Sequence, residues 1–329
     1  MKPLILTTDS SAAGVLWAAG LADLAITLTR RLVWGPAPSA SETATLFAAR
    51  KKTSLHWQDY TPPSRLEKCG GIDLGLIEFC ARYEAVELWI DPDPNAQMTL
   101  IWLLSFLRLH EEVIAKLSLV QADSTIGSCP PEVLAKGRPP AVKISEDHLA
   151  AASMAWQAYC APTPRDWFDL LETDLSVLPQ LRRTAVELLE ELPGRDTGLG
   201  ATEMRMLELI SEGDASPGDV LPGHKKRNKR RVFYFWEIGE LLDGLVHCPV
   251  PAVAGLDEGP FTMQMCDDRA RRRRYLQSRL SLTPFGKEIL AGGDDFTRHN
   301  PVHRWWGGTE LSNDRLWRWD SASRDLVAP

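Results

Sequence analysis

The 329-residue sequence lacks the features that mark membrane-spanning, disulfide-stabilised and several familiar catalytic proteins. No run reaches the roughly 18 strongly apolar residues that a membrane span needs, and we expect no membrane association. Asp9 interrupts the first apolar run, so we expect no signal peptide. The six cysteines are scattered and form no Cys-x-x-Cys pair, which favours free thiols in a reducing cytoplasm. The Gly-x-Ser-x-Gly nucleophile elbow and the His-Glu-x-x-His zinc motif are also absent.

The composition is that of an ordinary globular protein, with 44% hydrophobic and 25% charged residues. The net charge of −7 argues against a surface that coats nucleic acid throughout. Basic residues nevertheless gather in the second half of the chain. The length exceeds that of one typical hydrophobic core, and we therefore expect two domains.

Strand-like and helix-like segments alternate in the N-terminal part. Short apolar runs at residues 3–6, 25–29, 85–90 and 116–120 predict strands, and longer periodic segments at 41–52, 73–83 and 96–109 predict helices. This alternation is typical of an open, mainly parallel sheet with helices on both faces. We predict an α/β domain over residues 1–144.

Strand signals stop near Ser145, and residues 145–329 predict a mostly helical second domain. Helices at residues 202–211 and 233–245, followed by a strand-to-helix corner beginning at Leu282, indicate a winged-helix arrangement. The C-terminal tail carries tryptophans at positions 305, 306, 317 and 319, which we expect to cap a core.

Polar residues follow two of the predicted strands. Asp9, Ser10 and Ser11 come after the first strand and begin a helix, whereas Asp91 and Asp93 come after residues 85–90. The carboxyl ends of parallel strands meet at one edge of a sheet, where ligands usually bind. Backbone N–H groups at a helix N-terminus favour an anion. The sequence therefore predicts one crevice for a small anionic or phosphorylated ligand.

The same residues allow two other interpretations. Asp91 and Asp93 could act as catalytic carboxylates that hold Mg²⁺, as in a phosphohydrolase or nuclease. Asp and Ser are also common helix N-caps, and Asp-Pro-Asp-Pro is ordinary turn chemistry. The first turn has neither the lysine of a phosphate-binding P-loop nor the spacing of a dinucleotide-binding motif.

Two basic clusters flank the predicted helix at residues 233–245. Such clusters can neutralise the phosphates of nucleic acid, and the neighbouring aromatic residues 233–236 could stack on bases. Charge runs are also commonly solvated loops. The predicted nucleic-acid-binding residues are Lys225, Lys226, Arg227, Arg230, Arg231, Arg271, Arg272, Arg273 and Arg274.

An ordered set of short stretches resembles a bacterial family known as domain of unknown function 1835, with its usual C-terminal companion domain. The stretches include Arg304-Trp-Trp-Gly-Gly and Trp317-Arg-Trp-Asp, and they cover most of the chain. They are residues 7–14, 35–38, 88–93 with Gln97, 156–164, 198–203 and 280–320. The family has no settled activity, so the resemblance implies a relative and not a reaction.

This chain departs from the family at polar positions. Asp9-Ser10-Ser11 replaces the usual Gly-Asp-Ser, and Val33 and Trp34 replace acidic and histidine residues before Gly-Pro. Asp91-Pro92-Asp93 stands where the family has Glu-His-Asp, and Ala96 replaces the Asp beside Gln97. If those side chains perform chemistry in the family, the resemblance implies that this member is altered or impaired.

We therefore expect a bacterial, regulator-like protein with a ligand-binding α/β domain and a C-terminal domain that contacts a partner or nucleic acid. An enzyme that uses Asp91 and Asp93 and a protein-interaction scaffold are the alternatives. We expect Mg²⁺ only if the enzyme alternative holds, and we expect no other cofactor. The oligomeric state is left open. The predicted ligand-binding residues are Asp9, Ser10, Ser11, Gly14 and Gln97.

Overall fold

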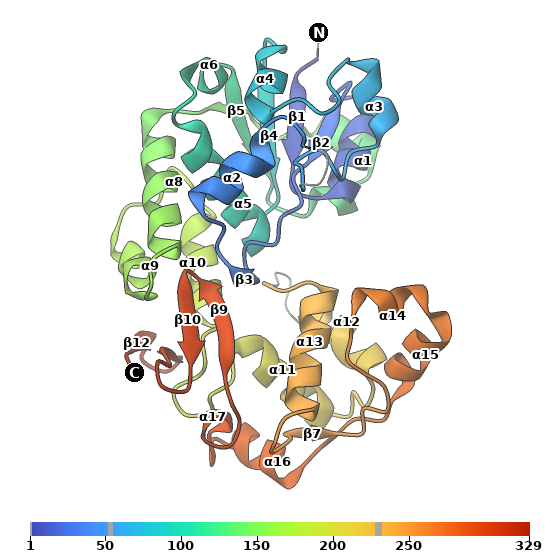
Figure 1. Ribbon diagram of the computed structural model, residues 1–329, viewed down its shortest axis with the longest axis vertical. Helices are drawn as coiled ribbons and strands as arrows, with labels where there is room; N and C mark the ends of the chain where they lie inside the picture. The colour runs from blue at the N-terminus through green and yellow to red at the C-terminus, as the bar shows by residue number, and fades with distance from the viewer. Residues whose placement is uncertain (1, 52–54, 228–231) are drawn as a thin grey trace. The chain divides into compact units, whose positions relative to one another are not determined.

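The computed structural model describes residues 2–51, 55–227 and 232–329 (Figure 1). The chain divides into two compact units, and neither is one continuous segment. The first unit comprises Met1–Leu32, Ala37–Cys160 and Leu170–Thr184, and the second comprises Val33–Pro36, Ala161–Asp169 and Ala185–Pro329.

This division does not follow the expected boundary between residues 144 and 145. Helix α8 (Glu146–Tyr159) belongs to the first unit, where it packs on α5 (Pro94–Leu107). The rings of Trp102 and Trp156 lie 6.4 Å apart in this contact. Segment Val33–Pro36 joins the second unit because its strand β3 (Gly35–Pro36) pairs with β9 (His303–Gly307). Both differences arise from contacts between residues far apart in the chain.

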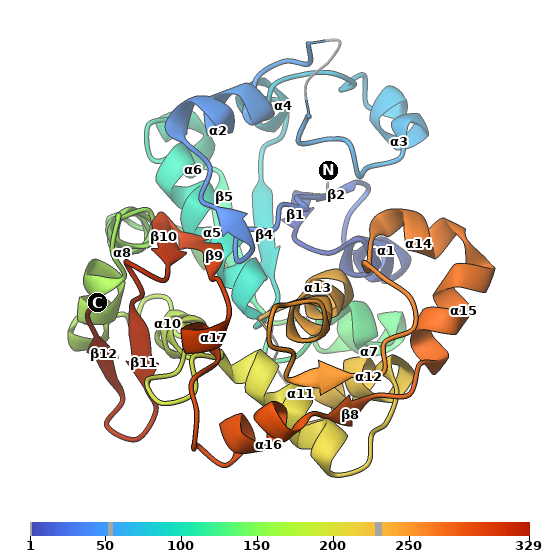
Figure 2. The ribbon, with the colours of Figure 1, turned by 60° about the horizontal axis from the view of Figure 1, so that its bottom comes forward.

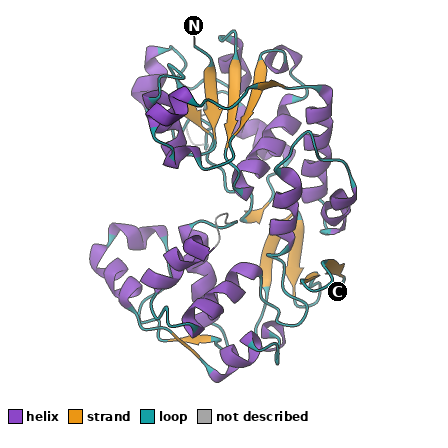
Figure 3. Ribbon diagram, turned by 180° about the vertical axis from the view of Figure 1, so that it is seen from behind, coloured by secondary structure: helices purple, strands orange, loops and turns teal. Residues whose placement is uncertain are grey.

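The first unit contains a five-stranded sheet with the order β2-β1-β4-β5-β6. Its four parallel strands are β1 (Leu4–Thr7), β2 (Ala25–Thr27), β4 (Val86–Ile90) and β5 (Leu117–Gln121), and β6 (Val142–Lys143) adds an antiparallel edge. Helices lie on both faces of the sheet (Figure 3). These features confirm the predicted α/β domain.

Strands β1 and β4 are buried along their whole length, with apolar side chains on both faces, as is typical of parallel sheets. Ile5, Trp89 and Val120 pack on one face against Leu16 of α1 (Ser10–Ala18). The remaining helices of the first unit are α2 (Ala40–Phe47), α3 (Pro63–Lys68), α4 (Leu76–Ala81), α6 (Glu111–Ile114), η1 (Ile126–Ser128), α7 (Pro131–Lys136) and η2 (Leu170–Glu172).

Two predicted helices are shorter than expected for local reasons. The segment predicted at 41–52 ends at Phe47, because Ala48 has an extended backbone. The segment predicted at 73–83 begins only at Leu76, because Asp73 has a φ of 62°, which is incompatible with a helix start. Helix α5 agrees with its prediction to within two residues at each end.

The second unit contains mainly short helices. Helices α11 (Ala201–Ser211), α12 (Pro217–Arg227) and α13 (Phe235–Val246) pack on one another, and α13 adjoins β7 (Val253–Ala254) (Figure 2). The other helices are α9 (Arg165–Asp169), α14 (Met263–Asp267), α15 (Arg269–Gln277), α16 (Pro284–Leu290) and α17 (Phe296–His299), while α10 (Leu181–Leu189) runs from the first unit into the second.

Three small sheets complete the second unit. Strand β7 pairs with β8 (Ser281–Leu282), β9 lies between β3 and β10 (Thr309–Ser312), and β11 (Arg318–Asp320) pairs with β12 (Asp325–Val327). Trp306 and Trp319 are buried, whereas Trp305 is 38% exposed. Two of the four tail tryptophans are thus buried side chains of this unit. None of the helices that the structure describes is both long and apolar enough to cross a membrane.

Candidate functional site

The carboxyl ends of β1 and β4 occupy the topological switch point of the sheet. The strand that follows β1 in the chain lies on one side of it and β4 lies on the other, so the direction of strand addition reverses there. Thr7 pairs with Trp89, which places Asp9 and Asp91 just beyond neighbouring strand ends. Ligands in open α/β sheets usually bind at such a point.

Asp9 acts as the N-cap of α1. Its Oδ1 accepts hydrogen bonds from the backbone N–H groups of Ser11, at 2.8 Å, and Ala12, at 3.0 Å. These are donors that an anion would use at a helix N-terminus. The helix N-terminus that we predicted to bind an external anion at Ser10 and Ser11 therefore binds the carboxylate of Asp9 instead. A Cβ added at Gly14 would meet no atom within 4 Å, so no close approach requires glycine there.

Asp91 and Asp93 also have hydrogen-bond partners within the protein. Asp91 is 2% exposed, and its Oδ1 accepts a 2.8 Å hydrogen bond from the N–H of Ile126 in η1. Gln97 donates from Nε2 to the Asp91 carbonyl oxygen at 2.8 Å. Asp93 caps α5, with its Oδ1 accepting from Ala96 N–H at 3.1 Å. The Asp93 contact is a helix N-cap, whereas the Asp91 carboxylate links the end of β4 to η1, which is distant in the chain.

The loop after β5 covers this strand end. A Cβ added to Gly127 of η1 would lie 2.8 Å from Ser11 Cβ and 3.2 Å from Asp9 Oδ1. The loop therefore rests directly on the first turn of α1. The predicted strand ends do meet, but η1 fills the space between them that a ligand would need.

The acidic residues influence one another at this edge. Burial raises the pKa of Asp91 to about 7, the hydrogen bond from Ile126 N–H opposes the shift, and the charges of Asp93 and Asp9 raise it further. Within residues 2–51, 55–227 and 232–329, no three His, Cys, Asp or Glu side chains form a group that could hold a metal ion. Asp9 and Asp93 each cap a helix through hydrogen bonds from backbone N–H groups.

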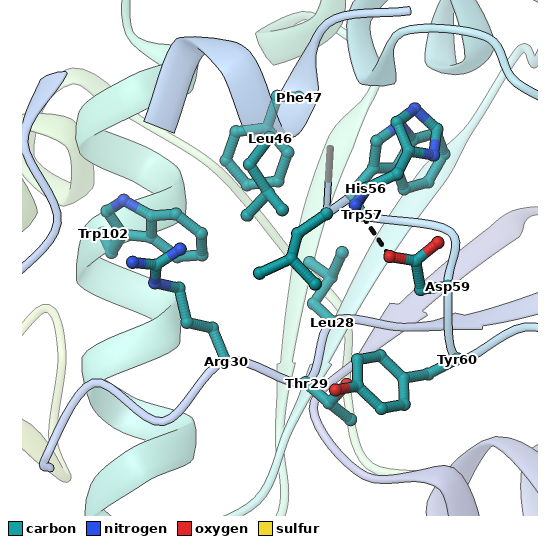
Figure 4. Close-up of a pocket in the computed structure, with 11 residues that line it drawn as sticks. Leu28, Thr29, Arg30, Leu46, Phe47, His56, Trp57, Asp59, Tyr60 and Trp102 are labelled. Atoms are coloured by element: carbon teal, nitrogen blue, oxygen red, sulfur yellow. Dashed lines mark hydrogen bonds between the residues drawn. The ribbon is translucent and has the colours of Figure 1, made fainter. Parts of the chain in front are cut away.

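A pocket of about 450 Å³ lies at the carboxyl end of β2, on the same edge of the sheet (Figure 4). Sequence analysis did not identify it. Polar residues follow β2, as they follow β1 and β4. The rule used for those two strands, that polar residues after a parallel strand mark a ligand site, would also have indicated this position. The pocket is lined by Leu28, Thr29, Arg30, Leu46, Phe47, Leu55, His56, Trp57, Asp59, Tyr60 and Trp102.

The aromatic walls of this pocket are held in place by hydrogen bonds and ring contacts. Trp102 donates from Nε1 to Thr43 Oγ1, and Trp57 donates from Nε1 to the Leu74 carbonyl, both at 3.0 Å. The ring of Phe47 lies 4.9 Å from that of Trp102. Such fixed walls reduce the ordering cost of binding a ligand.

Two polar residues of the lining have structural partners. The Nε2 of His56 lies 3.0 Å from the Ala48 carbonyl, and burial together with the nearby Arg50 lowers the pKa of His56. Asp59 accepts from the His56 N–H at 2.8 Å and forms a 2.6 Å ion pair with Arg50. Both residues shape the pocket wall.

The guanidinium of Arg30 instead stays available to a ligand. Among the residues that the structure describes, none forms an ion pair or hydrogen bond with the Arg30 guanidinium, although its charge lowers the pKa of Glu42. Thr29 Oγ1 is buried and has no hydrogen-bond partner among the described residues, and Tyr60, also in the lining, is 60% exposed. In Figure 4 these three side chains lie opposite Leu46 and Phe47.

The predicted basic clusters are only partly described. Arg271 and Arg274 of α15 bind Glu258 at 2.8 and 3.0 Å, whereas Arg272 and Arg273 are exposed. The first cluster falls outside what the structure describes: Arg230 and Arg231 lie beyond the described residues, as do the side chains of Lys225, Lys226 and Arg227.

Comparison of the chain with protein-family models and with curated proteins gives no match. The resemblance based on the ordered stretches therefore stays a prediction. Two of those stretches are neighbours in the fold, because Gly35 pairs with Trp306 and Pro36 pairs with Gly307.

Proposed function

We propose that the first unit binds a small anion with a flat apolar portion in the pocket at the end of β2. The guanidinium of Arg30 is the partner of the anionic group, and the aromatic walls enclose the apolar portion. The observation that carries this proposal is an arginine without an ion pair among the described residues, set in an aromatic pocket at the carboxyl edge of a parallel sheet.

The chemistry of the lining supports this ligand class. Arginine binds carboxylate and phosphate groups through paired N–H donors, and these bonds strengthen when water is excluded. Flat rings gain further attraction from aromatic side chains such as Phe47 and Trp102. A small anionic or phosphorylated ligand was predicted for this sheet edge, and the proposed site lies one strand further along it.

We do not extend the proposal to a reaction. Asp91 and Asp93, the acids of the enzyme alternative, serve as partners of backbone N–H groups. The contacts in the pocket at the end of β2 support binding and orientation.

Phenyl phosphate, inorganic phosphate and benzyl alcohol test the proposal by titration calorimetry. We expect phenyl phosphate to bind more tightly than either fragment, because only it engages both the arginine and the rings. Arg30→Gln should weaken its binding by about tenfold or more, the size of a charge-assisted hydrogen bond. Arg108→Gln, at an exposed arginine of the same unit, is the control. Equal binding by both variants would reject the site.

For the second unit, a contact with nucleic acid remains our proposal, on the support of two exposed arginines, Arg272 and Arg273. Helices α11, α12 and α13 followed by the antiparallel pair β7 and β8 support a winged-helix-like interpretation of this region. Each of these strands is only two residues long. Kinship with the family of unknown function is likewise proposed, on the order of its matching stretches.

A further inference from the structure

A second pocket, of about 710 Å³, lies within the second unit and has no part in the function proposed above. Strand β3 helps to form it by pairing with β9, which brings Trp34 and Gly35 beside the tail. The lining residues are Val33, Trp34, Gly35, Glu191, Phe233, His303, Arg304, Trp305 and Trp306.

Aromatic rings dominate this lining. Trp34 and Phe233 meet edge to face, with ring centroids 5.3 Å apart and planes at 84°. Trp305 adds a partly exposed indole from β9. The faces of aromatic rings carry negative potential, which attracts a cation within about 6 Å of the ring centre.

A buried carboxylate, Glu191, belongs to the same lining. It is 8% exposed, and its Oε1 and Oε2 accept hydrogen bonds from the hydroxyl and N–H of Thr202, at 2.6 and 3.1 Å. Burial raises the pKa of Glu191 to about 7, and the hydrogen bonds from Thr202 oppose that shift. The charge of Glu203 raises the pKa further and that of Arg304 lowers it. A cation bound nearby would favour the ionised form of the Glu191 carboxyl.

The arginine of the lining already has acidic and carbonyl partners. Arg304 Nη1 lies 3.2 Å from Glu203 Oε2, and its Nη2 donates to the Glu191 carbonyl at 3.1 Å. One of these partners is the Glu203 carboxylate and the other is the main-chain carbonyl of Glu191. An added anion would meet a guanidinium that is already paired, whereas an added cation would meet aromatic faces.

We propose that this pocket binds an organic cation of the ammonium type, held by the rings of Trp34 and Phe233 and balanced by the Glu191 carboxylate. Rings combined with a carboxylate suit quaternary and primary ammonium groups.

Choline and its uncharged isostere 3,3-dimethyl-1-butanol separate charge from shape in a calorimetric or NMR titration of the full chain. Choline should bind at least about fivefold more tightly than the isostere, because a desolvated cation–π contact contributes about 1–2 kcal/mol. Equal affinities, absence of choline binding, or tighter binding of benzoate than of choline would each overturn the proposal. This comparison uses only the unmodified protein, so a variant that folds poorly cannot obscure it.

Variants then locate the site. Glu191→Gln and Trp34→Leu should each weaken choline binding severalfold or more, while Trp17→Leu, at an exposed tryptophan of the first unit, should leave it unchanged. Thermal melting identifies any variant that has lost its fold, and Phe233→Leu is the replacement in that event. Unchanged affinity in a folded Glu191→Gln protein would contradict the assignment.

Discussion

Asp91 is held in the first unit by a hydrogen bond from a backbone N–H, in a position where ionisation is costly. It is buried, accepts from Ile126 N–H, and has the charges of Asp93 and Asp9 nearby. A carboxyl of this kind links the stability of the fold to pH.

Whether stability rises or falls with pH depends on the pKa of Asp91 in the folded and in the unfolded protein. Asp91 has an ordinary pKa of 3.8 and a folded-state pKa of about 7, so between these pH values the folded protein binds more protons than the unfolded chain. Its contribution to stability is full below about pH 4 and is lost as the pH rises through 7. Asp91→Asn removes this dependence and keeps an acceptor for Ile126. We therefore expect the Tm of the variant minus the Tm of the unmodified protein to be larger at pH 8 than at pH 5.

Thermal melts at both pH values check this expectation. Asp23→Asn is the matched control, because Asp23 is exposed and its ion-pair partner among the described residues is the exposed Lys2, at 3.6 Å. A Tm difference for Asp91→Asn that stays constant with pH would contradict the assignment of Asp91 as the titrating group.

At the scale of elements, the contact of η1 with the first turn of α1 decides whether the strand ends are open. Gly127→Ala would push a methyl group to 2.8 Å from Ser11 Cβ. We expect a loss of about 1–3 kcal/mol in the free energy of unfolding, as for other overpacked sites. Gly14→Ala, where the added Cβ meets no atom within 4 Å, should instead stabilise α1 by about 0.5–1 kcal/mol. Urea unfolding measures both, and similar effects would mean that η1 does not press on α1.

Helix α15 offers a test of the nucleic-acid proposal. Arg272 and Arg273 are exposed, whereas Arg271 binds Glu258. If α15 contacts phosphates, replacing Arg272 and Arg273 with Gln should weaken binding of duplex DNA and reduce its log–log salt slope by about two. Fluorescence anisotropy at several salt concentrations measures this slope. An unchanged slope would remove α15 from the interface.

At the scale of the whole molecule, residues after position 144 complete the core of the first unit. Helix α8 covers α5, and the Tyr159 hydroxyl donates a 2.8 Å hydrogen bond to the Leu32 carbonyl. A fragment of residues 1–144 would expose the buried side chains of α5 to water. We expect it to unfold without a cooperative transition, whereas residues 1–184 should unfold cooperatively. Circular dichroism during heating distinguishes the two, and a cooperative 1–144 fragment would show that α8 is dispensable.

The sequence by itself determined the local elements of this protein. The strands β1, β4 and β5 and the helix α5 were predicted closely, because apolar runs and turn residues are properties of neighbouring positions. It also placed Asp9 and Asp91 at adjacent strand ends, since parallel strands share one carboxyl edge. The capping alternative for Asp9 and Asp93 came from the same local chemistry.

Only the tertiary structure shows which distant residues surround these strand ends. The loop containing Gly127 fills the predicted crevice, and Arg30 stands without an ion pair among the described residues in a pocket one strand away. The pairing of Gly35 with Trp306 joins segments that are far apart in the chain and creates the pocket that Glu191 lines. Local patterns record the preferences of each segment. They do not record which distant segment will cover a polar group or leave it open, because that depends on how the whole chain packs.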